Sequence, residues 1–387
     1  MGRRPRSRKV ILSYVFDWAI VLFATAVGAV LANMTPNKRP FSLSNPEISY
    51  PFQHQEKVSL AMLGLYAMGL PAVIIFTVCM VLVPGPTIPK QIPKHAIWSR
   101  KLWEWHVGWL GLALSLSSSF LITSGMKNLF GKPRPDLLSR CDPDIVNLER
   151  YRLGGFMGTD VVSAAICRQT NMELLDDGFR SYPSGHSSFA AGGLIYLSLF
   201  IASKLAITIP YLPPSAFTGS EKLRLAAFPS HSARYYGKQE TCSGDINKQG
   251  ITGQASEHNP VIIGARNEAA APPIYLLIFA VVPFFTSVYI ASTRFSDYRH
   301  HGFDIIFGYV IGFICSVFSF RWYHLPIMQG AGWAWGPRSS ERSFWAGVGV
   351  GNYVGVLNKP KDDDASKRAL DHDQNDIEAG TRSENPN

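Results

Sequence analysis

Hydrophobic residues in this chain are gathered into six long blocks that polar segments separate. The blocks cover residues 10–31, 60–83, 107–124, 188–206, 274–292 and 303–321. A helix needs about 20 consecutive apolar residues to cross the hydrocarbon core of a bilayer, and each block is close to that length. The sequence therefore predicts an all-α, multi-pass membrane protein whose six transmembrane helices form a bundle. The first block is long for the apolar core of a cleavable signal, so we interpret it as an anchor.

Basic residues flank these blocks unevenly, within a net charge of +9. Before the first block and between the second and third stand Arg3, Arg4, Arg6, Arg8, Lys9, Lys90, Lys94, Arg100 and Lys101. Loops rich in Lys and Arg stay in the cytosol, so the amino terminus is predicted to be cytosolic. This topology accounts for the positive charge, and we expect no nucleic-acid partner.

The alternation of sides follows from a cytosolic amino terminus. It places the loops 38–57, 125–187 and 293–302 outside the cytosol, and the loops 86–105 and 207–272 inside it. We expect a basic amino terminus at 1–9, a six-span domain at 10–322 and a cytosolic tail at 323–387. Residues 207–272 are polar and lack a hydrophobic period, which predicts a flexible insertion. The acidic stretch from about 358 is predicted to be disordered.

Three short segments at block edges carry the candidate chemistry. They are Lys127-x6-Arg134-Pro135, Pro183-Ser184-Gly185-His186 and Arg294-x5-His300-x3-Asp304. The predicted topology puts all three on the non-cytosolic side, although it was derived from other residues. The sequence therefore predicts one site at the non-cytosolic face of the bundle.

The cations of these segments suit a phosphate ester. Its hydrolysis spreads negative charge over three oxygens, and electrostatic clamping supplies most of the acceleration. Arg binds two oxygens with its fork, whereas Lys acts as a point charge. Lys127, Arg134 and Arg294 are therefore predicted phosphate ligands, and the sequence has no carboxylate cluster at metal-ligand spacing, so we expect no metal or cofactor. Taken alone, Lys-x6-Arg-Pro could also arise by chance.

The second segment stands directly before the fourth block. Gly185 permits a close backbone approach, and the amides of Ser184 and Gly185 at a helix start could bind phosphate oxygens. His186 beside them could donate a proton to a leaving alcohol. The alternative is a plain helix-start signal with a serine cap.

In the third segment, four residues separate His300 from Asp304. On a helix the two share a face, so we expect Asp304 to accept the Nδ1 proton of His300 and leave Nε2 free to attack phosphorus. An interfacial pair that caps the helix is the alternative. His301 is assigned no role because its spacing to Asp304 is three, and Lys132 falls outside the pattern. Gly308 and Gly312 form a G-x-x-x-G pair, which is typical of close helix packing.

Together these motifs resemble the type 2 phosphatidic acid phosphatase family, in its eukaryotic lipid phosphate phosphatase branch. The similarity covers about 10–321, and Thr293 replaces the serine that the family more often has before the arginine. The resemblance implies metal-independent hydrolysis through a phosphohistidine, with His300 as nucleophile, Asp304 as its orienter and His186 as acid. It implies that phosphate is bound by Lys127, Arg134, Ser184, Gly185 and Arg294.

The family's usual substrates are phosphatidic acid, lysophosphatidic acid and diacylglycerol pyrophosphate, so the expected partner is a lipid phosphate in the membrane. A phosphatase of sphingoid-base or polyprenyl phosphates shares the same motifs, and a non-catalytic lipid-phosphate binder or transporter is a third alternative. We expect an endomembrane or the plasma membrane. Cys141 and Cys167 share the long outer loop, where an oxidising compartment would permit a disulfide; the sequence leaves that pairing open.

Overall fold

The computed structural model describes residues 8–85, 92–154, 160–205, 207, 273–325, 327, 333–338 and 343–344. The predicted flexible insertion, the disordered tail and most of the basic amino terminus lie outside the described residues. The chain divides into two compact units, one made of Met1–Val15 with Pro337–Asn387 and the other of Phe16–Gly336. The second unit contains the helical bundle and the candidate site.

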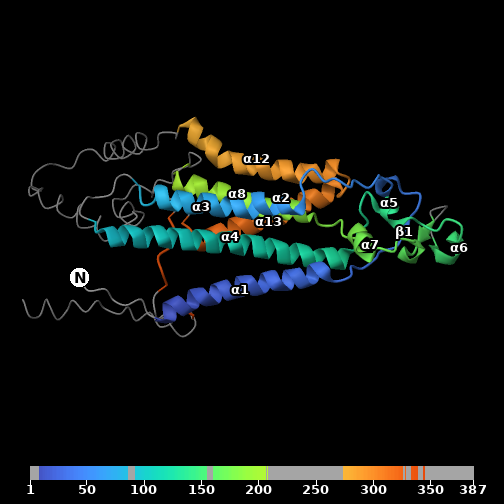
Figure 1. Cartoon of the computed structure of the whole chain (residues 1–387), viewed down its shortest axis with the longest axis horizontal. Helices are drawn as coiled ribbons and strands as arrows, with labels where there is room; N and C mark the ends of the chain where they lie inside the picture. The colour runs from blue at the N-terminus through green and yellow to red at the C-terminus, as the bar shows by residue number, and fades with distance from the viewer. Residues whose placement is uncertain are drawn as a thin grey trace, which may run out of the picture. The chain divides into compact units, whose positions relative to one another are not determined.

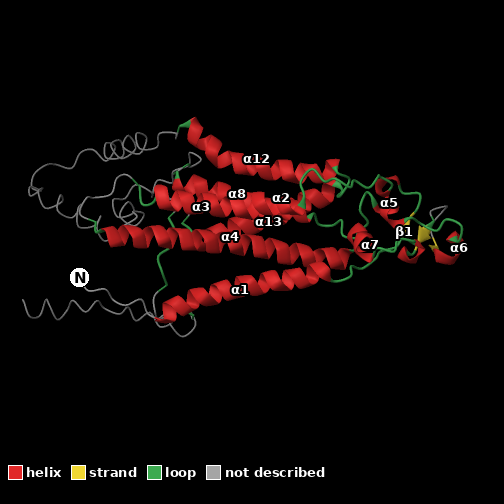
Figure 2. Ribbon diagram, in the orientation of Figure 1, coloured by secondary structure: helices red, strands yellow, loops and turns green. Residues whose placement is uncertain are grey.

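Six helical segments in the described part of the chain are long and apolar enough to cross a membrane. They are α1 (Arg8–Asn33), the run Leu60–Val81, α4 (Lys94–Phe130), α8 (Gly185–Lys204), α12 (Ile274–Ser296) and α13 (Gly302–Tyr323). Within the larger unit, α4, α8, α12 and α13 run side by side (Figure 1). The predicted all-α, six-span fold is confirmed, and helix dominates the ribbon (Figure 2).

The helix α4 is much longer than the predicted span 107–124. Its 37 residues correspond to about 56 Å at 1.5 Å per residue, against a hydrocarbon core of about 30 Å. It ends at Gly131, whose φ of 56° is left-handed and whose Cβ, if present, would lie 1.5 Å from the Asn37 carbonyl oxygen. Only glycine fits there, so α4 stops directly after the turn that carries Lys127.

The run Leu60–Val81 is not a uniform α-helix. It consists of α2 (Leu60–Gly64), a π-helical turn η2 (Leu65–Gly69) and α3 (Leu70–Val81). Pro71 cannot donate a backbone hydrogen bond in the first turn of α3, which favours such a local widening. The widened turn brings the carbonyl of Ala67 so close to α8 that a Cβ on Gly193 would lie 1.8 Å from its oxygen. The π-turn therefore packs α2 tightly against α8.

The G-x-x-x-G pair of α13 packs on the first turns of α8. A Cβ on Gly308 would lie 2.4 Å from the Ser184 carbonyl oxygen, and one on Gly312 would lie 2.2 Å from that of Ser188. The absence of side chains lets the two backbones touch. This contact fixes the start of α8, which carries His186, against the start of α13.

A small cap stands at one end of the bundle (Figure 1). Its short helices are α5 (Leu137–Cys141), α6 (Leu148–Tyr151) and α7 (Met172–Gly178), with 3-10 turns at Pro46–Ile48 and Ala164–Ile166. The strands β1 (Phe41–Ser42), β2 (Arg152–Gly154) and β3 (Val161–Val162) form an antiparallel sheet in the order β1-β3-β2. The sequence did not predict this sheet, because its strands have only two or three residues.

The cap has its own apolar core, and a disulfide crosses it. Leu137, Val162 and Phe179 are buried together, and Cys141 is bonded to Cys167. The structure thus settles the pairing that the sequence left open. The cap holds the loops that follow α4 and precede α8, so it positions two of the three motif segments.

Candidate active site

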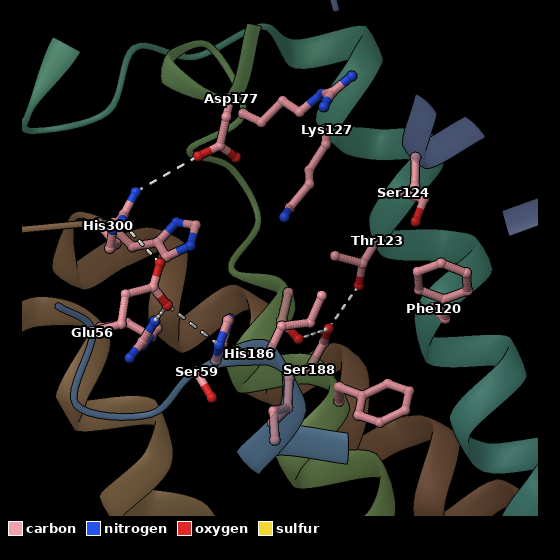
Figure 3. A pocket seen from close by; sticks show the side chains of 18 of the residues that line it. Glu56, Ser59, Phe120, Thr123, Ser124, Lys127, Asp177, His186, Ser188 and His300 are labelled. Atoms are coloured by element: carbon pink, nitrogen blue, oxygen red, sulfur yellow. Dashed lines mark hydrogen bonds and ion pairs between the residues drawn. The ribbon is translucent and has the colours of Figure 1, made fainter. Parts of the chain in front are cut away.

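The three motif segments meet at the end of the bundle that carries the cap. Lys127 lies in the last turn of α4, His186 in the first turn of α8 and Arg294 in the last turn of α12, while His300 lies between α12 and α13. All four line one cavity of about 820 Å³. Figure 3 shows the side chains that surround it. The three segments therefore lie around one cavity, as the sequence predicted.

His300 is buried, with 2 % of its surface exposed. Its Nδ1 atom lies 2.6 Å from the carbonyl oxygen of Ser181. A carbonyl can only accept, so Nδ1 carries the proton and Nε2 of the neutral ring keeps its lone pair. Burial lowers the pKa of His300 well below its usual value, and the positive charges of Arg134 and Lys127 lower it further. His300 is therefore neutral at neutral pH, as a nitrogen nucleophile must be.

The expected direct hydrogen bond between His300 and Asp304 is wrong. The helix α13 begins at Gly302, and His301 is its extended N-cap residue. His300 therefore precedes the helix, and a spacing of four does not place it on the face of Asp304. The carboxylate of Asp304 instead closes a capping box by accepting from the backbone N–H of His301, which is the capping role that the sequence left as the alternative.

Asp304 nevertheless reaches His300 through Ser181. The hydroxyl of Ser181 donates to Asp304 Oδ2 at 2.6 Å, and the other carboxylate oxygen of Asp304 lies 2.8 Å from Lys132 Nζ. The His301 Nδ1 atom is also 3.1 Å from Oδ2. His301 and Lys132, to which the sequence assigned no role, thus hold the carboxylate that anchors Ser181. Asp304 is not among the residues that line the cavity.

His186 faces the cavity from the first turn of α8. Its Nε2 atom lies 3.2 Å from the carbonyl oxygen of Val58, so Nε2 carries a proton. Val58 belongs to the chain segment 53–58, which precedes α2 and crosses the end of the bundle. The Nε2 proton of His186 is thus directed at the Val58 carbonyl, at the wall of the cavity.

The backbone amide of Ser184 in the second segment was predicted to bind a phosphate oxygen, but it is already engaged within the protein. The N–H of Ser184 donates to the carbonyl of Asp304 at 3.0 Å, and Ser184 is fully buried and outside the cavity wall. Ser184 therefore joins α8 to α13 and does not offer its amide to a ligand. Gly185 does line the cavity, and a Cβ there would lie 3.1 Å from Lys127 Nζ. Glycine at this position leaves room for the lysine side chain.

Two of the predicted phosphate ligands are held by carboxylates. Arg134 Nη2 lies 2.7 Å from Asp177 Oδ1, while its buried Nε has no hydrogen-bond partner within the described residues. Arg294 is buried, and its Nη1 lies 2.8 Å from Glu56 Oε2. Its Nη2 lies 2.8 Å from Asp297 and also donates to the Val58 carbonyl. The guanidinium groups are thus fixed before any ligand arrives.

Sequence reasoning missed these carboxylates and a further cation. Asp177 contacts both Arg134 and Arg140, and Glu56 contacts both Arg294 and Arg299. Burial alone would raise the pKa of Asp177, but Arg134 and Arg140 outweigh it and the pKa is lowered. Asp177 is therefore ionised and offsets part of the positive charge. The sequence offered one indication of these carboxylates, which is where they stand in the chain. Glu56 comes shortly before the second span, and Asp177 comes shortly before the Pro183–His186 motif.

The positive charge of the site comes from Lys and Arg side chains. Among the described residues, no three His, Cys, Asp or Glu side chains are grouped in a way that could hold a metal ion. The cavity is lined by Lys127, Arg134, Arg180, Arg294 and Arg299, together with Glu56 and Asp177. Five cations against two carboxylates leave a surplus of positive charge, which suits an anionic ligand.

The chain is similar to curated eukaryotic phosphatases. It is 27% identical to diacylglycerol pyrophosphate phosphatase 1 of Saccharomyces cerevisiae over 76% of this chain and 73% of that protein. It is 26% identical to the probable diacylglycerol pyrophosphate phosphatase 1 of Schizosaccharomyces pombe, over 76% and 75%. Lipid phosphate phosphatase 1 of Arabidopsis thaliana is 23% identical, over 84% and 72%. No solved structure matches the chain.

A protein family matches the part of the chain that contains the three motif segments. Residues 108–327 match the PAP2 superfamily, which is more than half of the chain. The matched stretch includes all three motif segments, the helices α8, α12 and α13, and α4 from residue 108 onward. The chain therefore belongs to the PAP2 superfamily.

Proposed function

We propose that this protein hydrolyses phosphate monoesters and pyrophosphates of lipids, without a metal, through a phosphohistidine on His300. One observation carries the proposal: a buried, neutral imidazole is held by its Nδ1 proton on the Ser181 carbonyl, in a cavity wall that also carries three motif cations. That geometry leaves the Nε2 lone pair for attack on phosphorus.

The steps follow from the positions of the side chains. Lys127, Arg134 and Arg294 hold the phosphoryl oxygens and neutralise the charge that spreads over them. As His300 Nε2 forms a bond to phosphorus, the protonated form of His186 donates a proton to the departing oxygen and becomes neutral. Water then attacks the phosphohistidine, His186 takes up the proton of that water, and inorganic phosphate is released.

A lipid suits the apolar part of the cavity wall. Leu60, Leu63, Phe120 and Phe189 line the cavity as well as the charged groups, and Figure 3 shows Phe120 near Thr123 and Ser124, away from Glu56 and His300. The polar end would take the phosphate and the apolar part the adjoining chain. Together with the names of the relatives, this supports diacylglycerol pyrophosphate, phosphatidic acid and lysophosphatidic acid as substrates.

We place the site at the non-cytosolic face, in an endomembrane or the plasma membrane. The basic residues around the first two spans support this orientation. The Cys141–Cys167 disulfide of the cap supports it too, because such bonds persist in oxidising compartments. Phosphate would then be released into a lumen or the exterior.

Two alternatives make different demands. Sphingoid-base and polyprenyl phosphates present the same phosphoryl group, so they would differ only in how they fill the apolar part of the cavity. A non-catalytic lipid-phosphate binder has no need of a neutral buried imidazole beside a proton donor, which favours the enzyme.

The test is phosphate release by purified protein in detergent with excess chelator, using a panel of lipid phosphates. We expect turnover of glycerolipid phosphates in the chelator. His300→Ala should abolish turnover while the protein remains membrane-inserted, and rapid quenching of the wild type should trap an acid-labile phosphoprotein that His300→Ala does not form. Activity in His300→Ala, or a strict magnesium requirement, would contradict the proposal.

A further inference from the structure

Glu56 lies outside the three motifs but stands in the wall of the catalytic cavity. Its side chain is 27 % exposed, and Oε1 lies 2.8 Å from Arg299 Nη2 while Oε2 lies 2.8 Å from Arg294 Nη1. The same Oε2 atom is 3.9 Å from His186 Nε2. Figure 3 shows Glu56 and His186 side by side at the cavity. A carboxylate at this place faces the proton donor of the proposed reaction.

The role of His186 creates an electrostatic problem. A histidine acts as a general acid from its protonated, positively charged form. The groups that face His186 are Lys127 of α4, Arg134 after α4, Arg294 of α12, His300 before α13 and Glu56 before α2. The three cations among them disfavour a positive charge on His186. Among the ion pairs of the described residues, Glu56 is the acidic partner of His186. The Val58 carbonyl, at 3.2 Å from Nε2, and an opposite charge at close range both stabilise an imidazolium in such surroundings.

Substrate binding strengthens the attraction between Glu56 and protonated His186. In the structure, Glu56 shares its charge between Arg294 and Arg299. A phosphoryl group that takes up Arg294 supplies that arginine with negative charge, so the carboxylate no longer needs to neutralise it. Arg299 contacts the other carboxylate oxygen, Glu56 Oε1, and keeps Glu56 in place, because Arg299 also donates to the Gln53 carbonyl and packs on the Phe52 ring.

We propose that Glu56 is a positioning residue that stabilises protonated His186, and that it thereby allows the enzyme to expel an alkoxide. This inference rests on the proposed function. The P–O bond breaks as His300 Nε2 bonds to phosphorus, a proton of protonated His186 moves to the leaving oxygen, and His186 recovers a proton from the water that cleaves the P–N bond.

The consequence is a dependence on the leaving group. The alkoxide of diacylglycerol is a strong base and requires the proton, whereas p-nitrophenolate and the phosphate that leaves a pyrophosphate are weak bases. General acid catalysis contributes about 100- to 10,000-fold, and Glu56 should supply part of this. Because Glu56 also holds Arg294, Glu56→Gln should lower kcat to some extent with every substrate. We expect the loss with phosphatidic acid to exceed the loss with p-nitrophenyl phosphate or diacylglycerol pyrophosphate by about 10- to 100-fold.

Two further readouts separate this role from a structural one. With phosphatidic acid, the high-pH limb of the rate profile, where His186 loses its proton, should move to lower pH in Glu56→Gln and return in Glu56→Asp. In a His186→Ala background, Glu56→Gln should cause no further loss with phosphatidic acid, because the two residues act as one unit.

The matched control is Glu47→Gln, which alters an exposed carboxylate in the same connection between α1 and α2 and should leave all three rates unchanged. Equal losses of Glu56→Gln with all three substrates, or no loss with phosphatidic acid, would overturn the inference. A wild-type protein that hydrolyses none of the three would instead overturn the proposed function, so the two failures are distinct.

Discussion

His300 and Ser181 are joined by a hydrogen bond of 2.6 Å between Nδ1 and the main-chain carbonyl oxygen. The hydroxyl of the same serine donates to Asp304 at 2.6 Å. Asp304 of the third motif therefore orients the His300 imidazole through Ser181, which lies just before the Pro183–His186 motif. A backbone carbonyl fixes the ring tautomer as firmly as a carboxylate would, without adding negative charge beside the phosphoryl group.

This relationship predicts that Ser181→Ala impairs catalysis without removing any group that touches the substrate. The carbonyl remains, but its position is no longer held by Asp304, so the imidazole loses alignment. Misplacement of a reacting group by about 1 Å can cost about 100-fold, and we expect kcat to fall by about 10- to 100-fold with little change in KM. Steady-state kinetics with a soluble aryl phosphate measure both constants.

Ser44→Ala provides the control, since Ser44 is an exposed serine in the cap region. Asp304→Ala should be at least as damaging as Ser181→Ala, because it also leaves Lys132 without its carboxylate. Wild-type kinetics in Ser181→Ala together with an inactive Asp304→Ala would show that Asp304 acts on His300 by another route.

The pKa of His300 makes a prediction about stability in acid. Burial, Arg134 and Lys127 hold this pKa well below about 6.5, so the ring is neutral when folded but becomes charged in the unfolded chain below that pH. The stability that the neutral His300 contributes to the fold is fully present above about pH 6.5. It is lost as the pH falls toward the pKa of His300 in the folded protein. In that window the group lowers the free energy of unfolding by about 1.4 kcal/mol per pH unit.

The comparison uses His300→Asn, whose amide can still donate to the Ser181 carbonyl but does not titrate. Thermal unfolding in detergent is measured from about pH 7 to pH 5 for both proteins. The wild type should lose stability more steeply than the variant, since all other titrating groups are shared. Parallel slopes would mean that His300 ionises normally in the folded state.

The sequence predicted most of the site because its chemistry is local. Lys127, Arg134, His186, Arg294 and His300 all line the cavity, as expected from three segments at the edges of apolar blocks. Each edge is fixed by the length of a span, so segments far apart in the chain are brought to one level of the bundle. This argument needs no knowledge of how the loops fold.

The parts that were missed depend on the loops. The contact of Glu56 with Arg294 joins residues 238 positions apart, and no spacing rule relates them. The direct pairing of His300 with Asp304 failed because α13 begins two residues after His300, and helix starts are among the least predictable features of a sequence. The role of Ser181 was hidden for a further reason, since a carbonyl contact leaves no trace in residue type.

The disulfide of the cap leads to two predictions, one about the stability of the protein and one about the side of the membrane on which the cap lies. The Cys141–Cys167 bond closes a loop of 26 residues around the apolar core of the cap. Replacing both cysteines by serine should lower the free energy of unfolding by about 3 kcal/mol, and reductant should lower Tm of the wild type but not of the variant. Activity should fall as well, because Asp177, which holds Arg134, lies in the cap helix α7.

Alkylation of intact membranes tests the side on which the cap lies. Cys141 and Cys167 should resist alkylation until a reductant is added, as expected in an oxidising compartment. Free thiols at both positions in untreated membranes would place the cap, and the active site beside it, in a reducing compartment.

The contact between α13 and α8 makes the last prediction. A Cβ on Gly312 would lie 2.2 Å from the Ser188 carbonyl oxygen, and one on Gly308 would lie 2.4 Å from that of Ser184. Backbone cannot yield as a flexible side chain can, so Gly312→Ala must push α8 away from α13. Overpacking of this kind costs about 1–3 kcal/mol, and it should displace His186 from the cavity wall, lowering kcat as well as Tm.

Gly302→Ala is the matched control in the same helix, because a Cβ on Gly302 meets no atom within 4 Å. It lies nearer to His300 than Gly312 does, yet it should leave both Tm and kcat close to the wild type. If Gly302→Ala were the more damaging of the two, proximity to the nucleophile would matter more than the fit of the helices. If Gly312→Ala lost stability but kept full activity, the position of α8 would not control the proton donor.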